Sequence, residues 1–214
     1  MKIIYLGHSC FQLISENGVR VVTDPYTQVG YEMQKTATDI LTISHSHFDH
    51  AYFDGVFGYS LVANEEKSYT YNGVEIVGEK TFHDPKQGAL RGENIIFKIK
   101  MDGITICHLG DLGEPCTASL LQKIGEVDIL LLPVGGKYTI DAMEAKNLAK
   151  SVSPKAIIPM HYKPIDGGLD IAPIENFLNL CTDERVEEVG YELSLDKKDL
   201  STEKTRVLYM IRRK

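Results

Sequence analysis

The feature that most constrains the fold is a dense run of metal-binding side chains, Ser44-His45-Ser46-His47-Phe48-Asp49-His50, which follows an apolar stretch of strand length. Imidazole nitrogens and carboxylate oxygens are preferred ligands of zinc, manganese and iron. In an extended loop, alternate residues can direct two histidines at one ion while the following aspartate and histidine reach a neighbouring ion. The alternative is a solvated, histidine-rich surface loop, which leaves this density of ligands unexplained.

Short apolar and β-branched runs predict that the first half of the chain is mostly β, with hairpin turns at Asn17-Gly18, Asn72-Gly73 and Asp102-Gly103. The strands expected there cover residues 2–6, 10–14, 19–23, 40–43, 60–63, 95–99 and 104–109. After Asp111, strand and helix patterns alternate. Helices are expected at 118–124, 141–151 and 174–181, and strands at 128–132, 156–159, 187–195 and 206–211. A chain of 214 residues is long enough for one sizeable core, so we expect a single α+β domain over residues 1–214.

Four further polar positions follow in sequence order at the ends of expected strands. They are Asp24, His83 in Thr81-Phe82-His83-Asp84, Asp111 in His108-Leu109-Gly110-Asp111, and His161 in Pro159-Met160-His161-Tyr162. Together with the His-x-His-x-Asp-His segment, they resemble the landmarks of the metallo-β-lactamase superfamily from about Leu6 to Tyr162. The resemblance implies a four-layer αβ/βα sandwich of metallo-β-lactamase type, with metals at the loop ends between two central sheets.

The same resemblance implies a ligand set for two divalent metal ions. The first ion would be held by His45, His47 and His83, the second by Asp49, His50 and His161, and Asp111 would bridge both. Zinc is the expected metal, with manganese and iron(II) as alternatives. Two such ions can lower the pKa of a shared water and polarise a substrate oxygen. Asp49 is also predicted to be catalytic, as the acceptor of the water proton.

The opening Gly7-His8-Ser9-Cys10-Phe11 resembles the Gly-His-Ser-x-Phe start of a compact subgroup of this superfamily. That subgroup includes bacterial lactonases that act on phosphorylated ascorbate. His8 lies in a loop with no evident packing role, so we predict that it lines the active site as a second catalytic residue. His108, on an apolar strand, is more typical of a hydrogen-bonded core histidine.

Other polar residues carry weaker predictions. Asp24 is expected to support a ligand histidine, because such histidines commonly donate their second N–H to a carboxylate. Asp84 could do the same for His83 or lie exposed. Lys137 and Tyr138 follow a Gly-Gly turn that could reach substrate, and Lys163 could pair with a carboxylate or phosphate.

The composition of the chain limits the kinds of partner that it can bind. The net charge of -7, interrupted only by the short basic tail Arg212-Arg213-Lys214, argues against a nucleic-acid partner, although a local basic cleft stays compatible with it. We see no apolar run long enough to span a membrane and no signal peptide, so we expect a cytoplasmic protein. The cysteines at 10, 107, 116 and 181 form no Cys-x-x-Cys pair and are expected to be reduced. A small-molecule substrate is expected, while self-association stays open.

The sequence therefore predicts a metal-dependent hydrolase that cleaves an ester, lactone, phosphodiester or amide bond. Two alternatives remain. The same ligands suit iron(II), which would allow redox or dioxygenase chemistry. The other alternative is a non-catalytic, regulatory metal-binding module. A structural zinc site, however, usually has four protein ligands and no bridging carboxylate.

Overall fold

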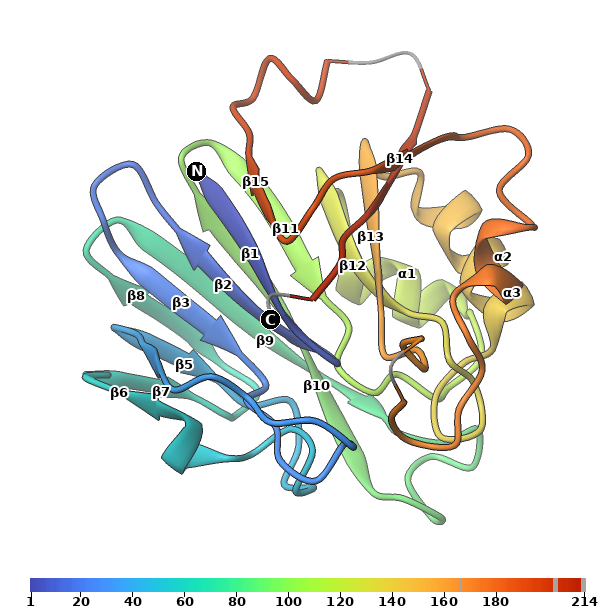
Figure 1. The fold of residues 1–214 in the computed structure, drawn as a ribbon, viewed down its shortest axis with the longest axis horizontal. Helices are drawn as coiled ribbons and strands as arrows, with labels where there is room; N and C mark the ends of the chain where they lie inside the picture. The colour runs from blue at the N-terminus through green and yellow to red at the C-terminus, as the bar shows by residue number, and fades with distance from the viewer. Residues whose placement is uncertain (166, 202–203, 213–214) are drawn as a thin grey trace.

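Two β-sheets form the centre of the computed structural model, which describes residues 1–165, 167–201 and 204–212 (Figure 1). The first sheet has the strand order β15 (Glu192–Ser194), β1 (Lys2–Gly7), β2 (Cys10–Ile14), β3 (Arg20–Thr23), β5 (Ile40–Thr42) and β7 (Leu61–Ala63). The second has the order β14 (Arg185–Glu188), β16 (Arg206–Tyr209), β13 (Ala156–Met160), β12 (Ile129–Pro133), β11 (Ile104–His108), β10 (Glu93–Met101), β9 (Val74–Phe82) and β8 (Ser68–Tyr71). Two short strands, β4 (Thr36–Ala37) and β6 (Val56–Phe57), pair separately.

The sheets pack face to face because their strands alternate in the direction of their side chains. In β1, Ile3 and Tyr5 belong to the main core between the sheets, whereas Ile4 and Leu6 belong to a smaller cluster on the opposite face of the first sheet. The segment after β3 covers that opposite face, and Tyr26 is its largest fully buried side chain. A 3-10 turn, η1 (Phe53–Gly55), ends this covering segment.

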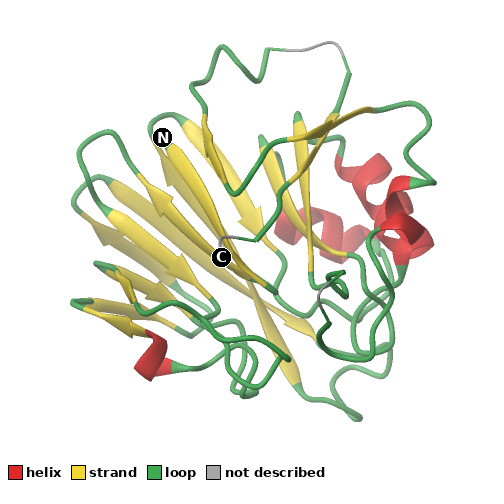
Figure 2. Ribbon diagram, viewed as in Figure 1, coloured by secondary structure: helices red, strands yellow, loops and turns green. Residues whose placement is uncertain are grey.

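Helices cover the outer face of the second sheet, beside β12 and β13 (Figure 2). These are α1 (Ala118–Ile124), α2 (Ala142–Val152) and α3 (Glu175–Leu178). Asp141 caps α2 by accepting hydrogen bonds from the N–H groups of Met143 and Glu144, and Glu144 completes a capping box. Strands β11, β12 and β13 are parallel, and β12 and β13 are buried along their whole length, as expected for strands covered on both faces.

The α+β sandwich and its three predicted hairpins are confirmed. Two expected elements differ. The strand expected at 187–195 is broken at Gly190, whose φ of 49° turns the chain, so β14 and β15 enter different sheets. The helix expected at 174–181 is shorter, because its last turns close with i to i+3 hydrogen bonds from Leu180 and Cys181.

Three other expectations concern the basic tail, membrane-spanning helices and the cysteines. Arg213 and Lys214 of the basic tail lie outside the described residues. None of the helices in the described residues is both long and apolar enough to cross a membrane. All four cysteines are free thiols, as expected.

Candidate metal centre

The predicted site residues all follow the ends of strands that run in one direction within their sheet. His8 follows β1, Asp24 follows β3, and the 45–50 segment follows β5. From the second sheet, His83 follows β9, Asp111 follows β11 and His161 follows β13. Loops after parallel strands emerge at the same edge of a sheet, so the fold gathers these side chains at one end of the sandwich.

Asp111 lies at the centre of the cluster and is buried. Its Oδ1 is 3.0 Å from His50 Nε2, and its Oδ2 is 3.2 Å from His161 Nε2 and 3.3 Å from His83 Nε2. His45 Nε2 lies 4.0 Å from the same Oδ2. One carboxylate therefore faces histidines from both sheets, which is the position predicted for a bridging ligand.

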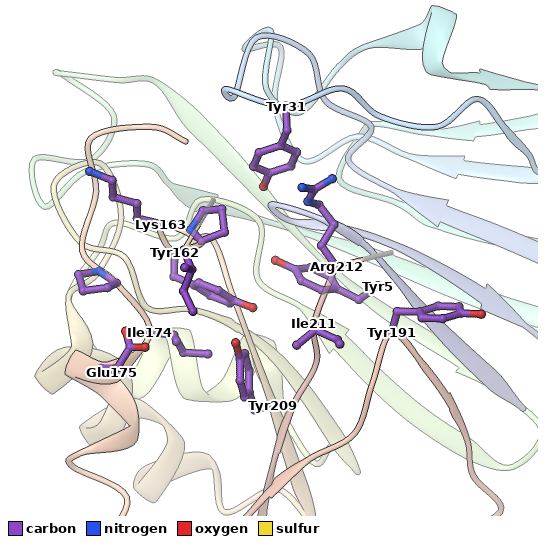
Figure 3. A pocket seen from close by; sticks show the side chains of 13 residues that line it. Tyr5, Tyr31, Tyr162, Lys163, Ile174, Glu175, Tyr191, Tyr209, Ile211 and Arg212 are labelled. Atoms are coloured by element: carbon purple, nitrogen blue, oxygen red, sulfur yellow. The ribbon is translucent and has the colours of Figure 1, made fainter. Parts of the chain in front are cut away.

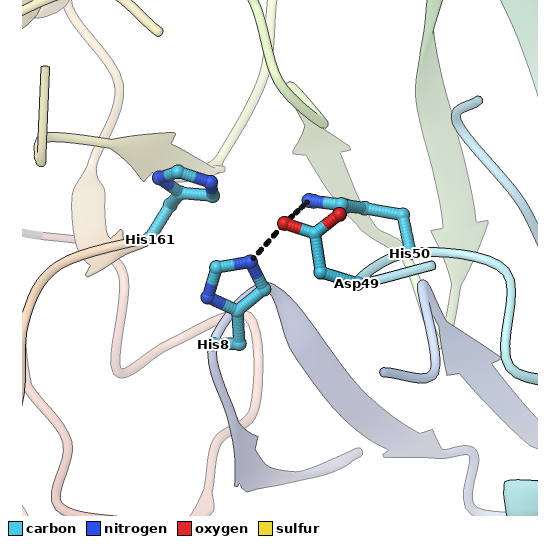
Figure 4. A group of neighbouring side chains, drawn as sticks. All are labelled: His8, Asp49, His50 and His161. Carbon is cyan, nitrogen blue, oxygen red and sulfur yellow. Dashed lines mark hydrogen bonds and ion pairs between the residues drawn. The ribbon is translucent and has the colours of Figure 1, made fainter. Parts of the chain in front are cut away.

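The donor atoms form three groups, within each of which they all lie within 4.8 Å of one another. The first contains His45, His47 and His83, as predicted for the first metal. The second contains the predicted set Asp49, His50 and His161, and His8 joins it. Figure 4 shows Asp49 between His8 and His50, with His161 facing them. The third group, His45, His50 and Asp111, connects the other two.

Several of these atoms are buried without a hydrogen-bond partner among the described residues. They are Nε2 of His45, His50 and His161, and Oδ1 of Asp111. Such atoms normally cost free energy unless something satisfies them. Here they point at one another at 3 to 4 Å without hydrogen-bond geometry. The arrangement fits cations placed among the side chains, because nitrogen and carboxylate oxygen donors then become ligands.

The pKa values of His45 and His50 in the cluster shift in opposite directions. Burial lowers the pKa of His45 to about 3, so its ring is neutral and its lone pair can bind a metal. For His50, burial also favours the neutral ring, but the carboxylates of Asp111 and Asp24 outweigh it and raise the pKa. Burial acts to raise the pKa of Asp111 as well, yet the surrounding His161 and His50 hold it well below the usual range. Asp111 is therefore ionised, as a bridging ligand requires.

Asp24 supports the cluster through a hydrogen bond with His50, as predicted. Its Oδ2 is 2.8 Å from His50 Nδ1, so that ring donates a hydrogen bond there and leaves Nε2 facing Asp111. The N–H of Ser44 donates to Oδ1 of Asp24 at 2.8 Å, and the Ser44 hydroxyl donates to Oδ2. The pKa of Asp24 is lowered because nearby histidines and this donor set outweigh the effect of its burial.

Asn94 supports Asp111, although no sequence pattern singles it out. From β10, its side-chain N–H₂ donates to Thr81 Oγ1 at 2.7 Å and to the Leu109 carbonyl at 3.0 Å. Its Oδ1 accepts the N–H of Asp111 at 2.9 Å. A Cβ at Gly110 would lie 2.4 Å from that Oδ1, so only glycine allows this approach. A lone asparagine in a strand carries no pattern, which is why it was missed.

The two histidines outside the predicted ligand set have different environments. His8 is buried, and its Nε2 is 3.3 Å from Asp49 Oδ2. Burial lowers the pKa of His8 to about 4. His108 instead has its Nε2 2.8 Å from the Ser9 carbonyl, and its Nδ1 accepts the Gly110 N–H. His108 is thus a core histidine with both ring nitrogens satisfied, as the sequence favoured.

Asp84 neither supports His83 nor lies exposed. It is buried and accepts four backbone N–H bonds, from Lys86, Gly88, Leu90 and Arg91, which organise the loop before β10. Lys137 pairs with Asp170 at 2.7 Å on the surface, and Tyr138 lies between the cations of Arg91 and Lys137. The structure therefore gives neither Lys137 nor Tyr138 a contact with the donor cluster.

Comparison with known proteins agrees with this fold. Residues 2–161 match the family model of a β-lactamase superfamily domain. Among relatives, a UPF0173 metal-dependent hydrolase of Thermoplasma acidophilum is 32% identical, over 78% of this chain and 85% of its own length. A relative of the same description from Methanospirillum hungatei is 26% identical, over 92% of this chain and 100% of its own length. The chain therefore belongs to the β-lactamase superfamily and, within it, to the UPF0173 metal-dependent hydrolases.

Solved structures extend the agreement to nearly the whole chain. A protein of Thermotoga maritima, described as a Zn-dependent hydrolase of the metallo-β-lactamase superfamily, has a TM-score of 0.81 and 38% identity and covers 99% of each chain. Igni18, a metallo hydrolase of Ignicoccus hospitalis, has a TM-score of 0.60 and 22% identity, over 79% of this chain and 86% of its own, and shows the common fold.

Proposed function

We propose that this protein is a hydrolase that holds two divalent metal ions and cleaves an ester, lactone, phosphodiester or amide bond in a small molecule. The observation that carries the proposal is that Nε2 of His45, His50 and His161, which have no hydrogen-bond partner among the described residues, converge on Asp111 from both sheets. The same proposal takes residues 1–214 as one hydrolase domain. One core that includes Met1 and Met210 fills the space between the sheets, which supports it.

In this proposal, His45, His47 and His83 would hold one ion, Asp49, His50 and His161 would hold the other, and Asp111 would be a ligand of both. Bound metals of this kind lower the pKa of water and polarise the substrate oxygen. Zinc suits the histidine-rich donor set, and the Thermotoga relative is described as Zn-dependent. Manganese and iron(II) are accepted by the same kinds of donor atom.

The chain's own residues then position the attacking water and receive its proton. Asp49 is ionised, because its interactions with His8 and His50 outweigh the effect of burial and lower its pKa. It can therefore accept a proton at a carboxylate oxygen. His8 is placed to donate a hydrogen bond from Nε2 to Asp49 Oδ2, which would hold the carboxylate in one orientation. We assign Asp49 as the catalytic base and His8 as its partner.

Two measurements test the proposal. Elemental analysis after dialysis against zinc or manganese should give close to two ions per chain, as expected for a two-metal site. Metal-loaded protein should hydrolyse at least one member of a panel of lactones, esters, phosphodiesters and amides, and the chelated protein should not. Saturation at one ion would contradict the two-metal assignment, and a metal-replete protein inactive on the whole panel would contradict the hydrolase assignment.

A further inference from the structure

A second cavity lies on the other side of the His8 backbone from the donor cluster. Its volume is about 940 Å³, which is within the range of small-molecule sites, and none of the proposed metal ligands lines it. Its walls come from β1, the segment after β13, the start of α3, and β16 with the residues after it (Figure 3). β1 and β16 each lie next to the edge strand of their sheet, so the cavity lies near one side of the sandwich.

Tyrosine, isoleucine and proline side chains make up most of the walls of this cavity. Five tyrosines contribute, namely Tyr5, Tyr31, Tyr162, Tyr191 and Tyr209, together with isoleucine and proline side chains. Figure 3 shows the side chains of Tyr5, Tyr31 and Tyr209 pointing towards one space with their hydroxyl ends. Flat aromatic faces beside apolar side chains are typical of a site for a planar organic molecule, which stacks on the rings.

The charge of the lining favours an anion. Lys163 and Arg212 line the cavity, against one carboxylate, Glu175, among the described lining residues. The guanidinium of Arg212 lies 4.2 Å from the centre of the Tyr31 ring, a position that holds its planar donors beside the cavity. Positive side chains thus outnumber negative ones among the described lining residues, in a chain whose net charge is -7.

The main chain of Gly7 and His8 forms a wall between the cavity side chains and the His8 ring, which lies in the donor cluster. Tyr5 OH donates to the His8 carbonyl at 3.0 Å, the His8 N–H donates to Tyr31 OH at 3.0 Å, and the His161 N–H donates to the same carbonyl at 3.1 Å. A Cβ at Gly7 would lie 2.7 Å from Arg212 Cδ, so the wall packs directly against the cavity side chains. A molecule in this cavity would contact residues that hold His8 in place without reaching the metals.

We propose that this cavity is a second binding site, distinct from the metal centre, for a planar apolar molecule that carries one anionic group. The anion would be bound by Arg212 and Lys163, and the apolar body would lie against the tyrosine rings. The proposal concerns a different site from that of the hydrolytic reaction, and it can be tested whether or not a substrate is known.

The test uses the metal-loaded protein and the fluorescent aromatic sulfonate 8-anilino-1-naphthalenesulfonate as the probe. We expect saturable binding of one probe per chain. 2-Naphthoate should displace it, and 2-naphthylmethylamine, of similar shape and opposite charge, should not. Arg212→Gln and Lys163→Gln should each weaken probe affinity, by about tenfold for Arg212→Gln, the size expected for loss of a charge-assisted hydrogen bond. Ile211→Trp, which enlarges a lining side chain that is partly exposed, should reduce probe binding without removing a charge.

Two controls make the result specific. Arg185→Gln removes an exposed arginine outside the cavity, and His47→Ala alters the exposed ligand of the metal centre; neither should change probe affinity. The thermal midpoint of each variant shows whether it is folded, since the probe also binds partly unfolded protein. Equal weakening by Arg185→Gln and Arg212→Gln, equal displacement by the amine, or loss of binding in folded His47→Ala would each overturn the proposal. Absence of saturable binding to the wild-type protein would overturn it as well.

Discussion

Asp49 and Asp111 are both buried carboxylates, but the side chains around them predict different consequences of removal. Asp111 lies within 3.3 Å of His50, His83 and His161, whereas Asp49 contacts His8 and His50 on one side of the cluster. Asp111→Ala should therefore release metal from both sites, because it removes an anionic ligand from each and leaves two cations close together with less screening. Elemental analysis and the thermal midpoint measure this loss.

Asp49→Ala should instead act mainly on the chemical step. We expect turnover to fall by roughly 10² to 10⁴-fold, the usual contribution of a positioned proton acceptor, with further loss if the second ion binds more weakly. The first ion should stay bound and the fold should be intact. If Asp49→Ala keeps wild-type turnover on the substrate that is found, the assignment of residues 45 to 50 as the catalytic segment is wrong.

Asp24 acts through His50, so its removal should change metal affinity more than stability. Asp24→Asn weakens the acceptor for His50 Nδ1, and loss of such a partner typically lowers metal affinity by about 10 to 100-fold. Titration of the chelated protein with zinc measures it. Asp39→Asn is the matched control, since Asp39 also accepts backbone and side-chain bonds near β3 but has no contact with the cluster. Equal zinc affinity in the two variants would contradict a supporting role for Asp24.

At the scale of elements, the ends of strands position the site residues. Gly135 allows the loop after β12 to pack closely against the main chain that follows β13. A Cβ at Gly135, in the loop after β12, would lie 2.1 Å from the carbonyl oxygen of His161. Gly135→Ala must therefore displace backbone that carries a proposed ligand, at a cost of about 1 to 3 kcal/mol for overpacking. Zinc affinity should fall together with the thermal midpoint. Gly103→Ala is the control. Gly103 has a positive φ that strains alanine, but a Cβ there would meet no atom within 4 Å, so stability should fall without loss of zinc affinity.

The Arg20–Asp39 pair joins β3 to the start of β5 and gives a pH-dependent contribution to stability. Arg20 Nε and one terminal nitrogen donate to the two oxygens of Asp39 at 3.0 and 2.9 Å. The hydrogen bond from Arg20 lowers the pKa of Asp39. Because the folded-state pKa is below the unfolded one, the stabilisation is present above about pH 4 and is lost as the pH falls through the lower, folded value.

Asp39→Asn should therefore reduce the free energy of unfolding at pH 7 but have less effect near pH 2. The side chain of Arg20 is 37% exposed, so solvent screening limits the difference at pH 7 to about 1 kcal/mol or less. Urea unfolding at the two pH values measures it. A difference between the proteins that grows as the pH falls would contradict this account.

The order of elements could be predicted from the sequence because it follows local rules, whereas the proposed ligand set came from the resemblance to the metallo-β-lactamase superfamily. Hairpin turns at Asn72-Gly73 and Asp102-Gly103 need positive φ, and the structure gives it to all four residues. The break at Gly190 could not be predicted, since a glycine within an apolar run does not show whether the flanking segments share a sheet. Asn94 and the Asp84 loop were missed for a similar reason. Their roles depend on neighbours distant in sequence or on a loop conformation that no pattern reports.

At the scale of the whole molecule, the donor cluster connects the two sheets. His45, Asp49 and His50 come from the first sheet, and His83, Asp111 and His161 from the second. If metals bind as proposed, they cross-link the sheets in the folded state. The unfolded chain would bring these donors together only at a large cost in conformational entropy. Metal should therefore stabilise the fold as a whole and not only the loops that carry the ligands.

We accordingly predict that chelation lowers the thermal midpoint of the entire unfolding transition. Zinc at 100 to 1,000 times its dissociation constant would stabilise the folded state by about 3 to 4 kcal/mol per site, if the unfolded chain binds it weakly. For a chain of this length, each kcal/mol shifts the midpoint by about 2 to 4 °C. Two sites thus give a shift of at least about 10 °C, measured by calorimetry with and without chelator. In Asp111→Ala the shift should be much smaller, because neither site can fill. A chelator-induced shift as large in Asp111→Ala as in the wild type would mean that the metal binds elsewhere.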